Sequence, residues 1–229
     1  MGYFDGFLSR YDRLVFFDTE TTGLNYSRDE IIEFSAVVLE RINGENVVTR
    51  EYDQLITLNP GNVVPPFIEK LTGITTEDIR EKGISKEQVC KDIGEMFSGN
   101  ALLLAYNAHF DLSFLYYLLL RNGDPAVLKG KDKIDLLTVY KDRHSYPHKL
   151  CNAIEVYGLS SKVVNSHRAV DDVLATVAVM EAMETEKNDL HRYINLFGYN
   201  SKYGLDGKPI GSITYKSQDY DPPAPLYEL

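Results

Sequence analysis

The chain has 229 residues, of which 44% are hydrophobic and 25% charged, a composition typical of a globular domain with room for an appendage. Its 24 basic and 34 acidic residues give a net charge of −10, which argues against a free-standing, high-affinity nucleic-acid binder but not against an enzyme that meets phosphates through bound metals. There is no membrane-length apolar run, no signal-peptide pattern and no metal-type spacing of the two cysteines, so we expect a cytoplasmic protein with reduced thiols.

The first strong pattern is an apolar run, Leu14–Phe17, that leads directly into Asp18 and Glu20. We interpret residues 1–13 as a polar lead-in and the run as a strand buried on both faces. Because side chains alternate along a strand, Asp18 and Glu20 point to the same side. Two like charges about 4 Å apart repel by about 4 kcal/mol at an effective dielectric of about 20, so we expect a divalent metal between them.

A hairpin is predicted next. Residues 31–39 form a second apolar run, and Asn43-Gly44 is the preferred pair for a tight turn between antiparallel strands. A third strand therefore begins near Val47, and Asn59-Pro60-Gly61 ends this part of the sheet.

Helices and strands alternate after this meander. Ser85 with Gln88 three residues later is a capping-box pattern, which predicts a helix start. The expected elements are, in chain order, helices at 66–72, 76–81 and 86–97, a strand at 101–106, a core helix at 111–121, a strand at 133–135, and helices at 135–142, 149–157 and 169–186. This order predicts an α/β domain with a mixed sheet flanked by helices.

The composition changes near residue 190, where tyrosines become frequent and an Asp-Pro-Pro-Ala-Pro segment follows. We therefore divide the chain into a domain at 1–188 and an extension at 189–229 that packs on the domain or on a partner. Leu205–Lys208 contains an Asp-Gly pair and is predicted to be a turn between two short strands.

Three further side chains belong with Asp18 and Glu20. Asp111 follows a predicted strand at the start of the core helix, where the helix dipole favours a carboxylate. His167 and Asp172 are five residues apart, about 140° round a helix, so they do not share a helix face. We place His167 in the loop before the last long helix, with Asp172 on the first turn and facing inward.

Four carboxylates and one histidine are the components of two-metal phosphodiester hydrolysis. Oxygen ligands suit Mg²⁺ or Mn²⁺ better than Zn²⁺. Two such ions, about 3.5–4 Å apart, stabilise the attacking and leaving oxygens of an in-line displacement, and a histidine can take the proton of the attacking water. Each motif alone has a plainer interpretation, as a strand-end turn, a helix cap or a surface histidine, but their order and placement together favour a nuclease.

Asp18-Thr19-Glu20-Thr21-Thr22-Gly23-Leu24, Asn107–Asp111 and His167–Asp172 resemble the three exonuclease motifs of the DEDD superfamily. The histidine form resembles the DEDDh (DnaQ-like) branch, which includes the proofreading ε subunit of bacterial DNA polymerase III and the PolC-type exonuclease domain. The resemblance covers about residues 12–185. It implies a ribonuclease H-like fold and metal-dependent 3′→5′ release of nucleoside 5′-monophosphates from single-stranded or frayed 3′ ends, chiefly of DNA, in proofreading or repair.

The resemblance also implies roles for single residues. Asp18 would bridge two Mg²⁺ or Mn²⁺ ions, Glu20 and Asp172 would hold the ion on the nucleophile side, Asp111 would reach the second ion, and His167 would be the general base. The residues expected to contact the substrate are Thr19, Thr21, Gly23, Leu24, Asn107 and Phe110. Leu24 is a candidate wedge against the penultimate base, whereas Phe110 either stacks on a base or anchors the core helix.

Other assignments stay open. Asp135 either supports the site or caps the helix that follows it, and the cap is favoured. Arg168 and Lys162 are candidate phosphate contacts. An RNase T-like exoribonuclease and a non-catalytic module that binds a polymerase or another partner are the alternatives to a DNA exonuclease. Because these 229 residues contain no polymerase region, we expect any polymerase partner to act in trans.

Overall fold

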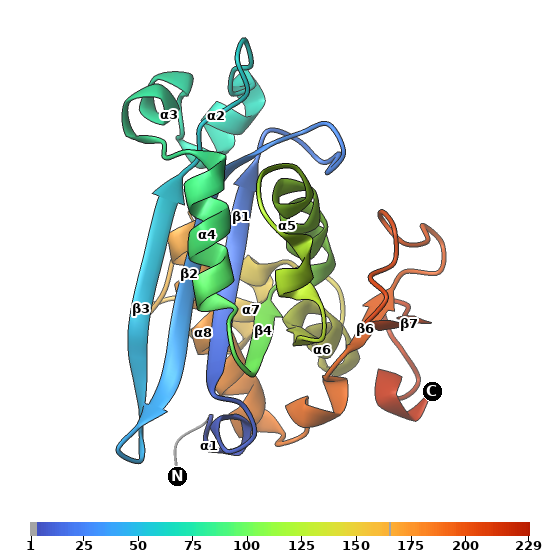
Figure 1. Cartoon of the computed structure of the whole chain (residues 1–229). Helices are drawn as coiled ribbons and strands as arrows, with labels where there is room; N and C mark the ends of the chain where they lie inside the picture. The colour runs from blue at the N-terminus through green and yellow to red at the C-terminus, as the bar shows by residue number, and fades with distance from the viewer. Residues whose placement is uncertain (1–3, 165) are drawn as a thin grey trace.

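Five strands form one mixed sheet in the order β3-β2-β1-β4-β5, in a computed structural model that describes residues 4–164 and 166–229 (Figure 1). The strands are β1 (Arg13–Thr21), β2 (Ile31–Ile42), β3 (Glu45–Leu55), β4 (Ala101–Ala105) and β5 (Asp132–Asp135). β1, β2 and β3 pair antiparallel, whereas β4 pairs parallel with β1 and with β5. The predicted mixed sheet, an antiparallel meander followed by parallel strands, is confirmed.

The central strand β1 is buried on both faces, as predicted. Leu14 and Phe16 belong to the core on one face of the sheet, and Val15 and Phe17 to the core on the other. β1 continues beyond this apolar run to Thr21, because it pairs with β2 along its whole length. Asp18 and Glu20 therefore lie within a strand that the neighbouring strand holds in register.

The hairpin between β2 and β3 has the predicted turn. Asn43 and Gly44 have φ angles of 52° and 87°, the left-handed conformation that both central residues of a type I′ turn require. β3 begins at Glu45, directly after this turn.

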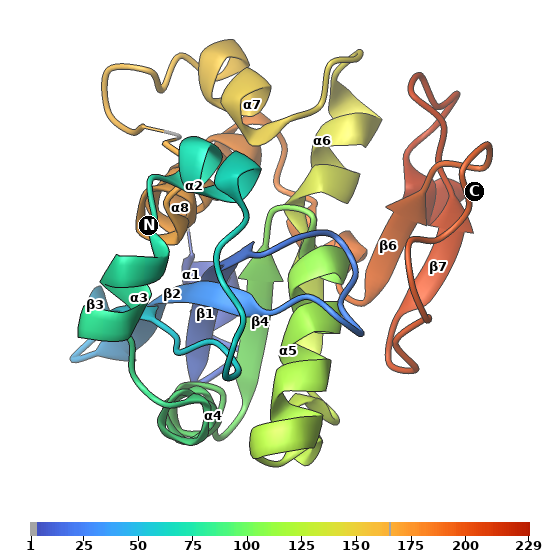
Figure 2. The same cartoon turned by 90° about the horizontal axis from the view of Figure 1, so that it is seen from above.

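Helices cover both faces of the sheet. The helices are α1 (Asp5–Leu8), α2 (Pro66–Thr72), α3 (Thr76–Lys82), α4 (Lys86–Met96), α5 (Ala108–Asn122), α6 (Leu136–Arg143), α7 (Leu150–Val156) and α8 (Ala169–Glu186), with 3₁₀ turns at Pro125–Leu128, Leu190–Tyr193 and Leu226–Glu228. Seen from above, α4 and α5 lie on one side of the sheet, and α7 and α8 on the other (Figure 2). None of the helices in the described residues is long and apolar enough to cross a bilayer.

The prediction of a polar lead-in before β1 is wrong for the residues that the structure describes. Phe4, Phe7, Leu8 and Tyr11 are buried, and α1 packs them into the core beside β1. Their spacing of three and four residues is that of a short amphipathic helix, a pattern too brief to stand out in the sequence.

The C-terminal part of the chain also differs from its prediction. β6 (Leu196–Tyr199) and β7 (Thr214–Ser217) pair parallel, so Asp206-Gly207 is not a hairpin turn between adjacent strands. Parallel strands need a crossover, and residues 200–213 supply it. Gly207 has a φ of 98° and lies so close to Tyr26 that a β-carbon there would be 2.5 Å from the ring, which explains the glycine without a hairpin.

The residues after 189 pack on the domain through buried polar contacts. The Tyr193 hydroxyl donates to Asp142, at 2.9 Å, and the Gln218 side-chain amide donates to the carbonyl of Thr138, at 2.8 Å. The division of the chain at residues 188 and 189 remains a prediction.

Candidate active site

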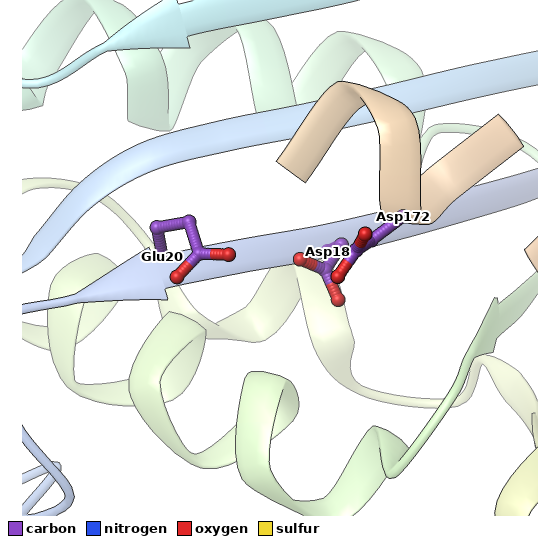
Figure 3. A group of neighbouring side chains, drawn as sticks. All are labelled: Asp18, Glu20 and Asp172. Carbon is purple, nitrogen blue, oxygen red and sulfur yellow. The ribbon is translucent and has the colours of Figure 1, made fainter. Parts of the chain in front are cut away.

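Three carboxylates from two elements meet beside the sheet. Asp18 and Glu20 project from β1, and Asp172 projects toward them from the first turn of α8 (Figure 3). One oxygen of each lies within 4.8 Å of the others. In the described residues, this group does not include Asp111 or His167.

The electrostatics of this group favour proton or cation uptake. Burial, followed by the charges of Asp111, Asp172 and Glu20, raises the pKa of Asp18 well above its ordinary value. Burial, followed by the charges of Asp172 and Glu33, raises the pKa of Glu20 to about 8. Burial and mutual repulsion thus favour the protonated forms of Asp18 and Glu20, and a cation that binds there would compensate the charge of their ionised forms.

Asp111 lies in the first turn of α5 and is tied to β1. Its Oδ1 accepts hydrogen bonds from the backbone N–H of Thr19, at 3.0 Å, and from the Thr19 hydroxyl, at 2.7 Å. Burial raises the pKa of Asp111 to about 7, although both bonds from Thr19 oppose the shift. Thr19, which the sequence suggested as a substrate contact, thus commits both its donors to Asp111.

The other expected substrate contacts surround the end of β1. Leu24 is 76% exposed, and the buried Thr21 hydroxyl donates to the Gly23 carbonyl, at 2.7 Å. A β-carbon at Gly23 would lie 2.4 Å from an Asp29 carboxylate oxygen, so a larger residue there would displace the Asp29 side chain.

Asn107 and Phe110 flank the start of α5. Asn107 is exposed and occupies the N-cap position with a φ of 67°, but its side chain makes no capping hydrogen bond. The half-buried Phe110 ring packs on Phe114, with centroids 4.8 Å apart, as expected of a residue that anchors the helix.

Asp135 supports α5 in addition to the favoured capping role. Its carboxylate accepts from Leu137 and Thr138 N–H groups at the start of α6. It also accepts from the N–H of Ala108, at 3.0 Å, which fixes the first residue of α5.

His167 occupies the bend directly before α8, where it is exposed and has a φ of 58°. Beside it, the sequence analysis missed a residue: Glu33 on β2, which is fully buried and opposite Glu20 in the strand register. Glu33 accepts from the Arg168 guanidinium, with the Nε contact at 2.8 Å, and from the N–H of Ala169, at 2.8 Å. It therefore fixes the segment between His167 and Asp172.

A sequence signal for Glu33 did exist, since it is a charged residue inside the apolar run 31–39. The ion pair also bears on Arg168, because the guanidinium proposed as a phosphate contact is turned toward Glu33.

The donor chemistry fits a hard divalent cation. Every atom offered by Asp18, Glu20 and Asp172 is a carboxylate oxygen, the ligand that Mg²⁺ and Mn²⁺ prefer over the nitrogen and sulfur ligands of zinc sites. Burial and neighbouring carboxylates raise the pKa values of Asp18 and Glu20, so a positive charge placed among them would stabilise their ionised forms.

Comparisons with known proteins agree with this geometry. The model of a family described as exonuclease, RNase T, matches residues 15–180. DNA polymerase III PolC-type from Caldanaerobacter subterraneus subsp. tengcongensis is 34% identical over 221 residues, 94% of this chain and 15% of that protein. The 3′-5′ exonuclease DinG of Bacillus subtilis is 34% identical over 165 residues, 64% of this chain and 17% of that protein.

The fold has counterparts among solved structures. The zinc-bound complex of E. coli exonuclease I with single-stranded DNA superposes with a TM-score of 0.69 at 25% identity, over 80% of this chain and 42% of that one. This likeness confirms the predicted ribonuclease H-like α/β fold.

Proposed function

This chain belongs to the RNase T exonuclease family, and on that premise we propose that it removes nucleotides from the 3′ ends of single-stranded or frayed DNA. The observation that carries the proposal is the group of Asp18, Glu20 and Asp172 within 4.8 Å, with Asp111 bonded to the same strand. Carboxylates are gathered in this way for metal-assisted phosphodiester hydrolysis. The name of the Bacillus subtilis relative supports the 3′→5′ direction.

We assign two Mg²⁺ or Mn²⁺ ions to the site. Asp18, Glu20 and Asp172 would hold one ion, and Asp111, next to Asp18 through Thr19, would reach a second. When bound, such ions supply Lewis-acid activation of water and stabilise charge on the attacking and leaving oxygens.

The remaining chemistry belongs to the chain. His167, exposed in the bend before α8, would take the proton of the attacking water at its imidazole. Glu33 would hold the backbone between His167 and Asp172, which orients the base relative to the carboxylates. Leu24 would separate the terminal base from the preceding one. Thr21 and Gly23 would line the position of the terminal nucleotide.

The comparisons favour DNA and a polymerase partner. One relative is named as a DNA polymerase III, and the exonuclease I structure holds single-stranded DNA. Parallel digestion of matched DNA and RNA strands separates this proposal from the exoribonuclease alternative, because only RNA offers a 2′-hydroxyl for recognition.

The test is digestion of a single-stranded DNA oligonucleotide labelled at either end, with and without Mg²⁺. We expect the 3′ label to leave at once as a mononucleotide and the 5′ label to remain on strands that shorten stepwise. Asp18→Asn should abolish release of the 3′ label and shortening of the 5′-labelled strand. Asp12→Asn, a change at an exposed acid before β1, should leave both reactions intact. Internal cleavage, or equal rates in EDTA, would contradict the proposal.

A further inference from the structure

The C-terminal extension, residues 189–229, contacts the domain close to the start of α5, the helix that carries Asp111. Its strands β6 and β7 lie on the α5 and α6 side of the molecule (Figure 2). Asn195 makes two hydrogen bonds to the backbone of Lys133 on β5, at 2.8 and 2.9 Å, so the extension lies against the edge of the sheet. These residues lie outside the stretch 15–180 that the exonuclease family model matches, so the family resemblance assigns them no part in the site.

His109, in the first turn of α5, is held at both ring nitrogens by this extension. Its Nε2 faces the Asp206 carbonyl, and because a carbonyl can only accept, we assign the ring proton to Nε2. Nδ1 then accepts from the Tyr215 hydroxyl, at 2.9 Å, and the Tyr215 oxygen accepts from the Ile210 N–H, at 3.1 Å. The His109 and Tyr215 rings are perpendicular, with centroids 5.4 Å apart. Each nitrogen of the His109 ring thus has a partner on the extension.

A second path of hydrogen bonds reaches the same end of α5 through Asp135. The Gly198 N–H, on β6, donates to the Thr138 hydroxyl, at 2.9 Å, and this hydroxyl donates to Asp135, at 2.7 Å. Asp135 in turn accepts from the Ala108 N–H, at 3.0 Å. The extension therefore acts on the first two residues of α5 by separate routes.

The position of this turn matters because it carries Asp111, two residues after His109. The Asp111 Oδ1 accepts from the N–H and the hydroxyl of Thr19, at 3.0 and 2.7 Å. A displaced start of α5 would lengthen these bonds and move Asp111 relative to Asp18, which lies on the same strand as Thr19. Functional side chains need positions accurate to about 0.5 Å, so contacts that fix the helix start bear directly on the site.

We propose that the C-terminal extension is a clamp that positions Asp111 for the metal centre, with Tyr215 as a positioning residue that acts through His109. The inference rests on the proposed function, in which Asp111 reaches the second metal ion. The clamp would then set the affinity for that ion and leave the ion held by the other three carboxylates unaffected. Because substrate contacts stay in place, loss of the clamp lowers kcat more than it changes KM.

Titration of Mn²⁺ into the full chain, with EPR to measure the free ion, tests the clamp without catalysis. Tyr215→Phe removes the hydroxyl that donates to His109, and it should weaken binding of the second Mn²⁺ about fivefold with the first unchanged. Tyr203→Phe, which removes a hydroxyl from a 70% exposed residue of the same extension, is the matched control. Equal affinities in the wild type and Tyr215→Phe, or equal losses for both ions, would overturn the clamp.

A double-mutant cycle separates positioning from general destabilisation. If Tyr215 acts through His109, the double variant His109→Ala/Tyr215→Phe should lose no more kcat than His109→Ala alone. KM for a single-stranded DNA oligonucleotide should stay nearly unchanged in all three variants. Losses of kcat that add would show that Tyr215 acts by another route, and this outcome would also overturn its role.

Amide exchange measured by NMR tests the clamp even in a chain without metal. The Thr19 amide, which donates to Asp111, should exchange faster in Tyr215→Phe than in the wild type, whereas the Leu14 amide of the same strand should not. Unchanged exchange at Thr19, or equal acceleration at both amides, would contradict the proposal. If the wild-type chain binds Mn²⁺ but releases no nucleotide, the proposed function fails, while Mn²⁺ affinity and amide exchange still decide on the clamp.

Discussion

The amide of Ala108, the first residue of α5, donates to Asp135 on β5, and the amide of Ala169, the first residue of α8, donates to Glu33 on β2. In both places a buried carboxylate on a strand fixes the start of a helix that carries an acid toward β1. Such a bond satisfies one of the N–H groups that a helix leaves unpaired at its N-terminus. Both helices are thus positioned in the same way, by a buried strand carboxylate that accepts from their first amide.

We call α5 with Asp111 the α5 arm and α8 with Asp172 the α8 arm. The two arms differ in the other hydrogen bonds that fix their positions. Asp111 of α5 is itself bonded twice to Thr19 on β1, so its position has support besides Asp135. At the start of α8, the contacts of Arg168 and Ala169 converge on Glu33. We therefore predict that loss of Glu33 disturbs the α8 arm more than loss of Asp135 disturbs the α5 arm.

The largest effect should come from removing the acid that α8 carries. Asp172→Asn should lower kcat by roughly 10³-fold, because a lost ligand forfeits several kcal/mol of transition-state stabilisation. Asp171→Asn, one residue earlier on the same turn, should retain nearly full activity. Mononucleotide release measures both, and equal losses would show that the turn as a whole, and not the inward carboxylate, is required.

Substitutions of Glu33 and Asp135, the carboxylates that accept from the first residues of the two helices, should have different effects on kcat. Glu33→Ala leaves the Ala169 amide and the Arg168 guanidinium without their acceptor, so it should cost about 2 kcal/mol of stability and lower kcat by roughly 10- to 100-fold. Asp135→Ala should cost about 1–3 kcal/mol of stability but lower kcat less, since Thr19 still holds Asp111.

Urea unfolding measures the stability loss of both variants, and steady-state kinetics measure their loss of kcat. The Glu33→Gln variant, which keeps an oxygen acceptor, should recover part of the lost kcat. A larger kcat loss in Asp135→Ala than in Glu33→Ala would reverse the comparison.

The pH dependence of stability should reflect the raised pKa values of the carboxylates that the two helices and β1 bring together. The pKa of Glu20 is raised from 4.5 to about 8 and that of Asp111 from 3.8 to about 7, so the folded chain binds more protons than the unfolded chain between these values. Stability without metal should therefore fall as the pH rises from about 4.5 to 8.

The measurement is Tm in EDTA across this range for the wild type and Glu20→Gln. The wild-type Tm should fall more steeply than that of the variant, and Mg²⁺ should restore it at the alkaline end. Parallel curves for the two proteins would exclude a raised pKa at Glu20.

The smallest effect should come from Thr19→Val, which removes the hydroxyl bond to Asp111 and leaves the backbone bond in place. Losing one of two bonds to a charged group costs about 1 kcal/mol, so kcat should fall only several-fold. A loss as large as that of Asp172→Asn would mean that the hydroxyl of Thr19 acts directly on the substrate.

Much of this arrangement could be predicted from local patterns. Four apolar residues before Asp18 predict a buried strand, and the spacing of Asp18 and Glu20 places both on one side. Asp172 could be oriented because five residues from His167 span more than one helical turn. The α1 helix escaped notice because four residues are too few for a periodic pattern.

Contacts across the fold could not be predicted in the same way. Glu33 and Ala169 are 136 residues apart, and Thr19 and Asp111 are 92 apart, so no local pattern links them. The parallel pairing of β6 and β7 was hidden because an Asp-Gly pair signals a tight turn, whereas Gly207 serves close packing on Tyr26.

The central claim is that β1, α5 and α8 together form one metal centre, and locating Mn²⁺ tests it most directly. An anomalous difference map from crystals grown with Mn²⁺ and a nucleoside 5′-monophosphate should show one ion among Asp18, Glu20 and Asp172 and a second at Asp111. The same crystals of Asp172→Asn should lose the first ion. Ions bound only elsewhere on the surface, or an unchanged map in the variant, would contradict the account.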